Sequence, residues 1–311
     1  MTNRVRRQGA RSRRLDPGNG TGSSSHKCNI RAISFRNETK VTPRRWGTAW
    51  EDADVLIDGD FDRDGAVCLR GLVGPELLGL AEEAVEAVLA DPSPLALRAS
   101  EPGDGAFVED FCNWRRIPAL EAFIRACPGS AVAADLLGAR DLRLYHDHVL
   151  VKEAGTTQRT PWHQDQPYYN VDGRQGVSMW LPLDRVSGEA TLQVVAGSHT
   201  GPWYLPRTFL DEQAKWFPEG ELEELPDIDG DRAAHTILAW DLEPGDAVFF
   251  HFAAVHGTGG TGARRRVLSI RYIGDDMRHA PRPWPTSPPF EGLADELPAG
   301  APLRGPWFPS L

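Results

Sequence analysis

Two short segments of the sequence carry histidine and aspartate at spacings that could bind a metal ion. In the segment Pro161-Trp162-His163-Gln164-Asp165-Gln166, His163 and Asp165 are two residues apart. This spacing would put both side chains on one face of an extended strand, where both could face one ion. A hydrogen-bonded core pair would have the same spacing, so the pair needs a third ligand to become convincing.

The stretch from Gly245 to Gly257 offers two candidates for that ligand. His251 lies among aromatic residues in an apolar run, which is the usual setting of a packed core histidine. His256 lies where the run meets a glycine-rich segment, a position from which it could reach an open metal site. Two histidines and one carboxylate leave three adjacent positions of an octahedral ion free. That arrangement suits Fe(II) binding a bidentate co-substrate together with O2, whereas zinc favours a more closed tetrahedral set.

A basic segment, Arg264-Arg265-Arg266, runs directly into the predicted strand 267–273. A buried guanidinium one strand from the metal could bind the far carboxylate of a dicarboxylate through a bidentate pair. At least two of the three arginines would in any case belong to a solvated basic turn. Alternation along the strand puts Arg265 on one face with Val267, Ser269 and Arg271, and Arg266 on the other with Leu268, Ile270 and Tyr272.

The elements that must position these residues change in type along the chain. Gly74-Pro75-Glu76 predicts the start of a helix that ends before Asp91-Pro92, with one apolar face formed by Leu77, Leu78, Ala81, Val85, Val88 and Leu89. Weaker helical patterns cover 120–124 and 132–137, the second ending at Gly138. After Asp141 the chain predicts short strands at 142–151, 177–183, 191–195, 236–240, 247–252 and 267–273. Such strands indicate an antiparallel sandwich or jelly roll. The long segment 201–231 is expected to be an active-site lid.

Composition limits the class of protein. Residues 1–45 hold twelve Lys/Arg against two Asp/Glu and predict a disordered basic tail, followed by a single domain at 46–311. The whole chain has a net charge of -10, so its body is acidic. An acidic body makes nucleic acid an improbable substrate, and a nucleic-acid-directed enzyme would rest on the tail alone. No apolar stretch is long enough to span a membrane. The scattered cysteines, Cys28, Cys68, Cys112 and Cys127, predict free thiols in a reducing cytoplasm.

The region from Phe61 to Asp276 resembles the phytanoyl-CoA dioxygenase family, which includes ectoine hydroxylase and many bacterial natural-product hydroxylases. The matching motifs are Asp62 to Val67, Val151 to Gly155, Trp162 to Gln166, Val177 to Asp184, Gly197-Ser198-His199, Gly245-Asp246, His256-Gly257 and Arg265 to Tyr272.

The resemblance implies a mainly β fold with flanking α-helices, a double-stranded β-helix of the jelly-roll, cupin-like type. It also implies that His163, Asp165 and His256 bind Fe(II). By the same resemblance Arg265 binds the C5 carboxylate of 2-oxoglutarate with help from Thr258, and Trp180 and His148 line the co-substrate pocket. Nine positions separate His256 from Arg265, slightly fewer than the family usually has. A register slip of one residue would therefore select Arg266.

The activity implied is a dioxygenase that uses Fe(II), 2-oxoglutarate and O2 to hydroxylate a small organic metabolite, with release of succinate and CO2. Halogenases of this broad type have a small residue at the carboxylate position, so Asp165 favours hydroxylation. Desaturation, epoxidation or ring closure would follow the same hydrogen abstraction. The alternative is a non-catalytic metal-binding jelly-roll protein, which the loss of a ligand or of the arginine would support.

The substrate is expected to be a small polar metabolite or a secondary-metabolite intermediate. Arg116 and Arg174 are candidates to receive a carboxylate or phosphate on it. The other candidate pocket residues are Trp114, Gln166, Tyr168, Tyr169 and the segment 201–231. Trp114 and the two tyrosines could equally belong to the core. The sequence leaves the oligomeric state open.

Overall fold

The structure is a computed structural model that describes residues 55–98, 105–206 and 222–311. All of these residues belong to one compact unit. The predicted tail, residues 1–45, and the middle of the predicted lid, residues 207–221, lie outside the described residues. The extent predicted for the domain, 46–311, also begins outside them.

The strands of the described residues form two main antiparallel sheets and one short pair. In spatial order, the large sheet contains β1 (Leu56–Asp60), β2 (Ala66–Arg70), β11 (Ala247–His251), β8 (Gly176–Pro182), β13 (Arg265–Ile273), β5 (Arg143–Lys152), β4 (Phe107–Phe111) and β3 (Leu97–Arg98). The small sheet contains β10 (Ile237–Ala239), β9 (Leu192–Val195), β12 (His256–Thr258) and β6 (Thr160–His163). The pair is β14 (Arg278–His279) with β7 (Val171–Asp172).

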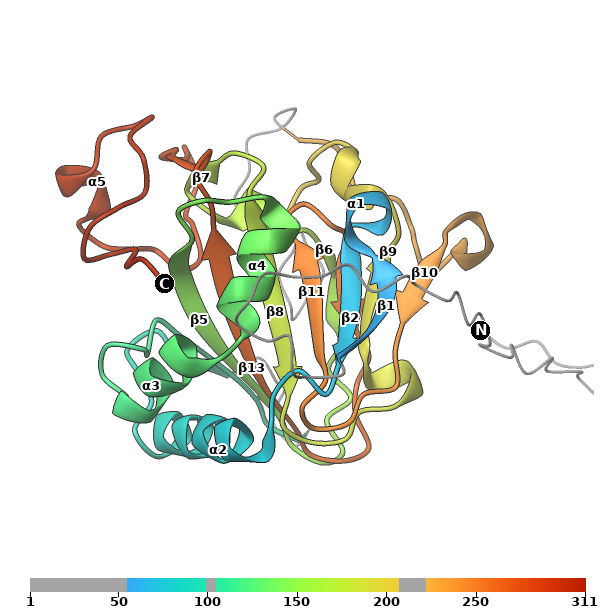
Figure 1. Ribbon diagram of the computed structural model, residues 1–311. Coiled ribbons are helices and arrows are strands. Elements are labelled where there is room, and N and C mark those ends of the chain that lie inside the picture. Colours follow the sequence, from blue (N-terminus) through green and yellow to red (C-terminus); the bar gives the residue numbers. More distant parts are fainter. Residues whose placement is uncertain (1–54, 99–104, 207–221) are drawn as a thin grey trace, which may run out of the picture. The chain divides into compact units, whose positions relative to one another are not determined.

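Helices cover the outer face of the large sheet (Figure 1). They are α2 (Pro75–Ala90), α3 (Pro118–Ala126) and α4 (Gly129–Leu137). Shorter elements are α1 (Phe61–Asp64), α5 (Leu293–Glu296) and the 3-10 turns η1 (Gln166–Tyr168), η2 (Gly188–Ala190), η3 (Ser198–Thr200) and η4 (Arg232–Ala234). The predicted helix at 75–90 is confirmed, with a proline in its first turn. The helix predicted to end at Gly138 also does so, because that residue adopts the left-handed conformation that favours glycine.

The alternation of side chains along β13 divides the core into an outer and an inner part. Leu268, Ile270 and Tyr272 pack against the helices in the outer cluster. Val267 belongs to the inner cluster, together with residues of β2, β8, β11 and β9, so this cluster lies between the two sheets. Each fully buried large apolar side chain stabilises the fold by about 1.5–3 kcal/mol. A register slip of one residue would turn several such side chains to the wrong face and lose their contributions.

The fold class predicted from the sequence is confirmed. Two antiparallel sheets with helices on one side form the double-stranded β-helix that the resemblance implied. Among the described residues, no helix is long and apolar enough to cross a membrane. The described cysteines, Cys68, Cys112 and Cys127, are free thiols, as predicted from their spacing.

Candidate metal centre

His163, Asp165 and His256 lie together between the two sheets. His163 ends β6 and His256 begins β12, and the two residues are direct partners in the register of these strands. One potential ligand atom from each of the three residues lies within 4.8 Å of the others. All three residues are buried. The structure therefore brings together the three residues that the sequence offered as metal ligands.

Backbone hydrogen bonds orient both imidazoles. The Nδ1 atom of His163 lies 2.8 Å from the carbonyl oxygen of Pro161, and that of His256 lies 2.9 Å from the carbonyl oxygen of Ala254. A carbonyl accepts only from a protonated nitrogen, so each ring carries its hydrogen on Nδ1. Each Nε2 is left with the lone pair that a metal requires. Burial lowers the pKa of His256 to about 3, which keeps this lone pair available at neutral pH.

The two carboxylate oxygens of Asp165 have different surroundings. Oδ1 lies 3.6 Å from Nε2 of His163 and 3.6 Å from Nε2 of His256. Oδ2 accepts a hydrogen bond of 2.8 Å from Ser178 Oγ and lies 3.5 Å from an Arg271 guanidinium nitrogen. One oxygen is therefore held by the protein while the other faces both histidines. This arrangement fits a carboxylate that binds a metal through a single oxygen.

Arg271 keeps Asp165 ionised inside the protein. Burial, the largest single effect, would raise the pKa of this carboxyl group, but Arg271 together with His163 and His256 more than offsets burial and holds the pKa well below its usual range. Arg271 is itself 5% exposed and donates through Nε to the Tyr169 hydroxyl at 3.1 Å. The site thus offers two imidazole nitrogens and one anionic carboxylate oxygen, a set of donors that suits a divalent ion of intermediate softness.

Two premises of the sequence interpretation are wrong, although the residues still meet. Asp165 is not on an extended strand, because β6 ends at His163 and Asp165 has the helical backbone angles that start η1. His256 is not at the end of the apolar strand either. That strand, β11, ends at His251, and a turn carries the chain across to the small sheet, where His256 starts β12.

His251 has the surroundings of a core residue. Its Nε2 lies 2.6 Å from the carbonyl oxygen of Arg174, and its Nδ1 accepts a hydrogen bond of 3.0 Å from the backbone of Ala253. Both ring nitrogens are therefore used within the fold. The residue lies outside the group of potential metal ligands found among the described residues.

A second polar cluster lies at the start of β13. The guanidinium of Arg265 is 4% exposed, hydrogen bonds to Thr258 Oγ1 at 3.2 Å and to the Ala190 carbonyl, and lies 5.8 Å from the Trp180 ring. Burial lowers its pKa to about 10. Within the described part of the chain, no carboxylate forms an ion pair with Arg265.

Lys152 adds a second buried basic side chain and was not identified from the sequence. It is the register partner of Arg265 on β5 and donates from Nζ to Thr258 Oγ1 at 3.3 Å and to the Gln158 carbonyl at 2.7 Å. Burial lowers its pKa to about 6. The signal was present in the sequence, because Lys152 follows His146, His148 and Leu150 in the two-residue period of one strand face.

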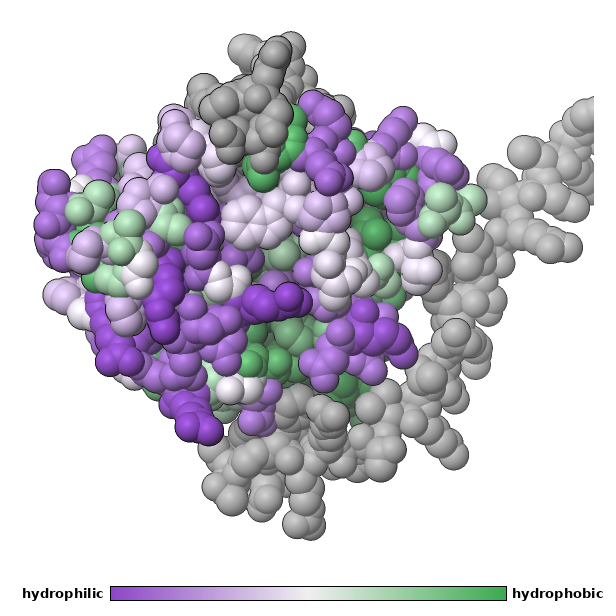
Figure 2. All heavy atoms as spheres, turned by 90° about the horizontal axis from the view of Figure 1, so that it is seen from above, coloured by the Kyte–Doolittle hydropathy of each residue, from purple (hydrophilic) through white to green (hydrophobic). Residues whose placement is uncertain are grey.

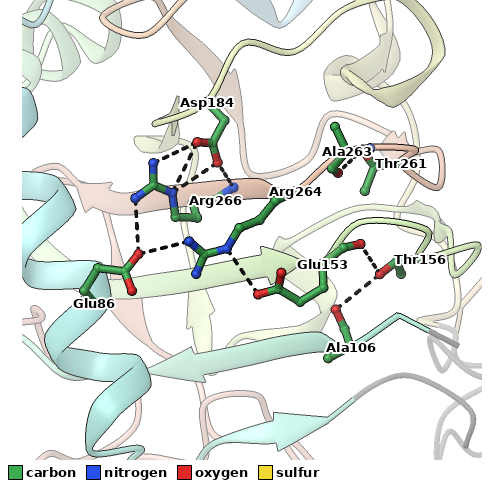
Figure 3. A network of polar contacts seen from close by, with 9 residues as sticks. All are labelled: Glu86, Ala106, Glu153, Thr156, Asp184, Thr261, Ala263, Arg264 and Arg266. Atoms are coloured by element: carbon green, nitrogen blue, oxygen red, sulfur yellow. Dashed lines mark hydrogen bonds and ion pairs between the residues drawn. The ribbon is translucent and has the colours of Figure 1, made fainter. Parts of the chain in front are cut away.

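Arg266 lies among acidic side chains, and Figure 3 shows it with Asp184 and Glu86. Its guanidinium forms ion pairs with Asp184 at 2.8 Å, Glu82 at 3.1 Å and Glu86 at 3.2 Å. Arg264 shares Glu86 and also pairs with Glu153. The register of β13 therefore places Arg265 between the sheets and Arg266 beneath α2.

Trp180 and His148 lie on opposite sides of Ser269 in the large sheet, one on β8 and the other on β5. His148 is stacked on Phe111 with 4.0 Å between ring centroids, and its Nε2 lies 3.4 Å from Glu109. Burial holds the pKa of His148 well below its ordinary value. Both residues face the interior, and His148 contacts the buried acid Glu109, which sequence reasoning also missed.

Of the two predicted substrate-binding arginines, Arg116 is engaged elsewhere, because its side chain hydrogen bonds to Asp91 and Asn113. Arg174 contributes its backbone, whose amide donates to Asp276. Trp114 packs against the outer core, as its alternative interpretation held. The remaining candidates flank the centre: Gln166 and Tyr169 are buried beside it, and the Tyr168 ring lies edge-on to His163 at 5.7 Å.

A family model confirms what the motifs suggested. The model described as "Phytanoyl-CoA dioxygenase (PhyH)" matches residues 61–267 of this chain. A curated relative, a "Probable phytanoyl-CoA dioxygenase" of Caenorhabditis elegans, is 29% identical over 164 residues, which are 47% of this chain and 48% of the relative. The chain therefore spans about half the length of that relative.

Solved structures share the fold at low sequence identity. The α-ketoglutarate-dependent carbocyclase SnoK from nogalamycin biosynthesis has a TM-score of 0.65 and 23% identity, over 81% of this chain and 93% of its own. The epimerase SnoN, solved with Fe3+, α-ketoglutarate and nogalamycin RO, has a TM-score of 0.64 and 22% identity, over 80% of this chain and 95% of its own. EctD from S. alaskensis, solved with 2-oxoglutarate and 5-hydroxyectoine, has a TM-score of 0.55 and 21% identity, over 72% of this chain and 79% of its own. At these identities the likeness shows the fold alone.

Proposed function

The chain belongs to the phytanoyl-CoA dioxygenase family, and on that premise we propose that it is an Fe(II)- and 2-oxoglutarate-dependent oxygenase that hydroxylates a small organic molecule. The observation that carries this proposal is the geometry of His163, Asp165 and His256. The Nε2 atoms of His163 and His256 each lie 3.6 Å from the same oxygen of Asp165, so that three potential ligand atoms converge. Three protein ligands leave three adjacent positions of an octahedral ion for a bidentate co-substrate and O2.

Arg265 and Lys152 are proposed to hold the far carboxylate of 2-oxoglutarate, with Thr258 between them. Both basic side chains are buried, and Arg265 forms no ion pair with a described carboxylate. Charge-assisted hydrogen bonds to an anion would offset much of the cost of burying them. Trp180, which packs beside the guanidinium, and His148, which faces the same interior, are proposed to line this pocket.

Bound iron and 2-oxoglutarate would supply the activation of O2, with one oxygen atom passing to the substrate and one to succinate as CO2 leaves. The protein's own groups position and shield the reacting atoms. Backbone carbonyls fix the two imidazoles, and Ser178 and Arg271 hold the second oxygen of Asp165 away from the metal. The buried surroundings exclude water from the centre.

The substrate is proposed to be a small metabolite, with intermediates of secondary metabolism as the first candidates. The carbocyclase SnoK of similar fold comes from nogalamycin biosynthesis, and EctD was solved with 5-hydroxyectoine. The carbocyclase, the epimerase and EctD all share this fold. We propose hydroxylation because Asp165 provides the third protein ligand, and mass analysis of the product distinguishes it from desaturation or ring closure.

The proposal is tested by titrating metal-free protein anaerobically with Fe(II) and then with 2-oxoglutarate. Chelation of iron by the keto acid gives a weak visible charge-transfer band. We expect this band in the wild type and in His251→Ala, and its loss in His256→Ala. Succinate release in the presence of O2 then identifies substrates. A wild type that binds metal without developing the band would support the non-catalytic metal-binding alternative.

A further inference from the structure

Arg271 lies on the interior face of β13, six residues beyond Arg265 and on the side of the metal centre. Six residues of a strand span about 20 Å, so the two arginines belong to separate parts of the interior. In Figure 1, β13 runs from the helix-covered end near α2 toward β7. Seen from above in Figure 2, this β7 end is covered mainly by hydrophilic side chains, with paler ones toward the middle.

The guanidinium of Arg271 uses only part of its hydrogen-bonding capacity. Nε donates to Tyr169 and one terminal nitrogen lies 3.5 Å from Asp165. The other terminal nitrogen, Nη1, is buried without a hydrogen-bond partner. An unsatisfied buried donor costs about 1–3 kcal/mol, and more when the donor is charged. A group of this kind at a metal centre is a binding site for an acceptor that the protein itself does not supply.

The neighbour of Arg271 across the sheet does not neutralise its charge. His146 is its register partner on β5, and the His146 Nε2 atom is also buried without a partner. Burial, followed by the charge of Arg271, lowers the pKa of His146 to about 3, so the ring is neutral. The unpaired atoms of these two side chains therefore present one cationic donor and one neutral imidazole.

A count of charges points to the same kind of ligand. Besides the histidines, the acidic, lysine and arginine side chains that face this interior are Arg265, Arg271, Lys152, Asp165 and Glu109, three basic against two acidic. The charges of an Fe(II) ion and a 2-oxoglutarate dianion cancel each other. Lys152 has a pKa of about 6 in the protein without ligands, and a carboxylate bound beside it would raise that pKa and restore the proton. One positive charge would then remain in a buried space. A buried charge without a counter-charge is costly.

We infer that Arg271 binds an anionic oxygen of the substrate, such as a carboxylate or an ionised enol, next to the metal. This inference rests on the proposed function and adds the substrate class. The anion would accept hydrogen bonds from Nη1 of Arg271 and neutralise the one positive charge that remains in the interior. Asp165 does not fill this role, because one of its oxygens faces the histidines and the other is held by Ser178.

The test uses the smallest anion that carries the chemistry. Anaerobic wild-type protein loaded with Fe(II) and saturating 2-oxoglutarate is titrated with acetate and, separately, with acetamide, a neutral molecule of nearly the same shape. The charge-transfer band reports binding next to the metal. We expect acetate to shift the band in a saturable way, and acetamide to bind at least tenfold more weakly.

Two variants assign the effect to one residue. Arg271→Gln should weaken the binding of acetate at least tenfold, and Arg271→Lys should restore part of the affinity for acetate. Arg266→Gln removes the same charge from the opposite face of the same strand, where the side chain pairs with Asp184, Glu82 and Glu86, and should leave acetate binding unchanged. The wild-type comparison of acetate with acetamide requires no variant to fold.

Three outcomes overturn the inference: acetate leaves the wild-type band unchanged, acetamide binds as well as acetate, or Arg271→Gln retains full acetate affinity. These differ from failure of the proposed function, in which the wild type develops no band with Fe(II) and 2-oxoglutarate. A purely structural Arg271 would change metal affinity in its variants without any preference for acetate over acetamide.

Discussion

Replacing Lys152 by methionine should stabilise the protein at neutral pH while weakening its binding of 2-oxoglutarate. Lys152 is 1% exposed, and burial, reinforced by the charge of Arg265, lowers its pKa from 10.5 to about 6. The amine must therefore lose its proton when the chain folds at pH 7. Methionine is similar in length and uncharged, so the variant avoids that cost.

The size of the gain follows from the pKa and the hydrogen bonds. Deprotonating a group with an unfolded pKa of 10.5 costs about 5 kcal/mol at pH 7. The variant loses three hydrogen bonds, to Gln158, Thr258 and Gly259, worth about 1 kcal/mol each. The net gain is about 2 kcal/mol, which would raise the Tm of a domain of this size by about 4–8 °C.

The difference between the variant and the wild type should change with pH in one direction. Between pH 10.5 and about 6 the unfolded chain binds the proton and the folded chain does not. Wild-type stability therefore rises with pH by about 1.4 kcal/mol per unit through this window, and the variant lacks this term. The advantage of the variant should grow as the pH falls toward 6 and vanish near about pH 8, where the lost hydrogen bonds offset it.

Calorimetry of the metal-free proteins at several pH values from 6 to 9 measures this difference. Arg159→Met is the control, because it removes a cation that is 53% exposed and paired with Asp229 at the surface, where an ion pair contributes little. A Lys152→Met variant that melts below the wild type at pH 6, or a difference that does not vary with pH, would refute the reasoning. Titration of the Fe(II) protein should show 2-oxoglutarate affinity reduced about tenfold.

Three further predictions concern the metal centre and its surroundings. His256→Ala should abolish Fe(II) binding, measured by equilibrium dialysis, whereas His251→Ala should leave it intact and lower the free energy of unfolding by about 1–3 kcal/mol, since two hydrogen bonds are lost. Arg265→Ala should raise the 2-oxoglutarate concentration needed for the charge-transfer band at least tenfold without changing iron affinity; if Arg266→Ala does so instead, the assignment of the arginine is wrong. Ser178→Ala should weaken Fe(II) binding about tenfold because it frees the second oxygen of Asp165, and unchanged affinity would show that this hydrogen bond does not orient the ligand.

The strand alternation and the helix signals of the sequence were sufficient to predict most of the fold. The period-two pattern of 265–273 correctly separated the interior residues Arg265 and Arg271 from Leu268 and Ile270. The strand β4 was not predicted, because its segment Phe107–Phe111 contains Glu109 and Asp110, which suggest an exposed loop. Both acids are about 1% exposed in the structure, and their burial depends on partners distant in the sequence, such as His148.

The candidate site shows a similar limit. The types of residue in the metal centre could be listed from spacing, but spacing alone did not decide between His251 and His256. The choice depends on a turn that ends β11 and carries the chain to the other sheet. Likewise Ser178 could not be connected with Asp165, because Ser178 lies on β8 of the large sheet whereas Asp165 starts η1, just after a strand of the small sheet.

The two interior arginines of β13 also suggest an order of binding. Arg265 has no carboxylate partner among the described residues, so its site is ready for an anion without the metal. Arg271 differs, because Asp165 already neutralises part of its charge. A metal ion bound to Asp165 would draw on that negative charge and leave Arg271 less neutralised. Acetate should therefore bind at Arg271 more tightly in the Fe(II) protein than in the metal-free protein, which carbon NMR of labelled acetate can measure. Equal affinity in the two forms would mean that the Asp165–Arg271 pair does not couple the metal to the substrate anion.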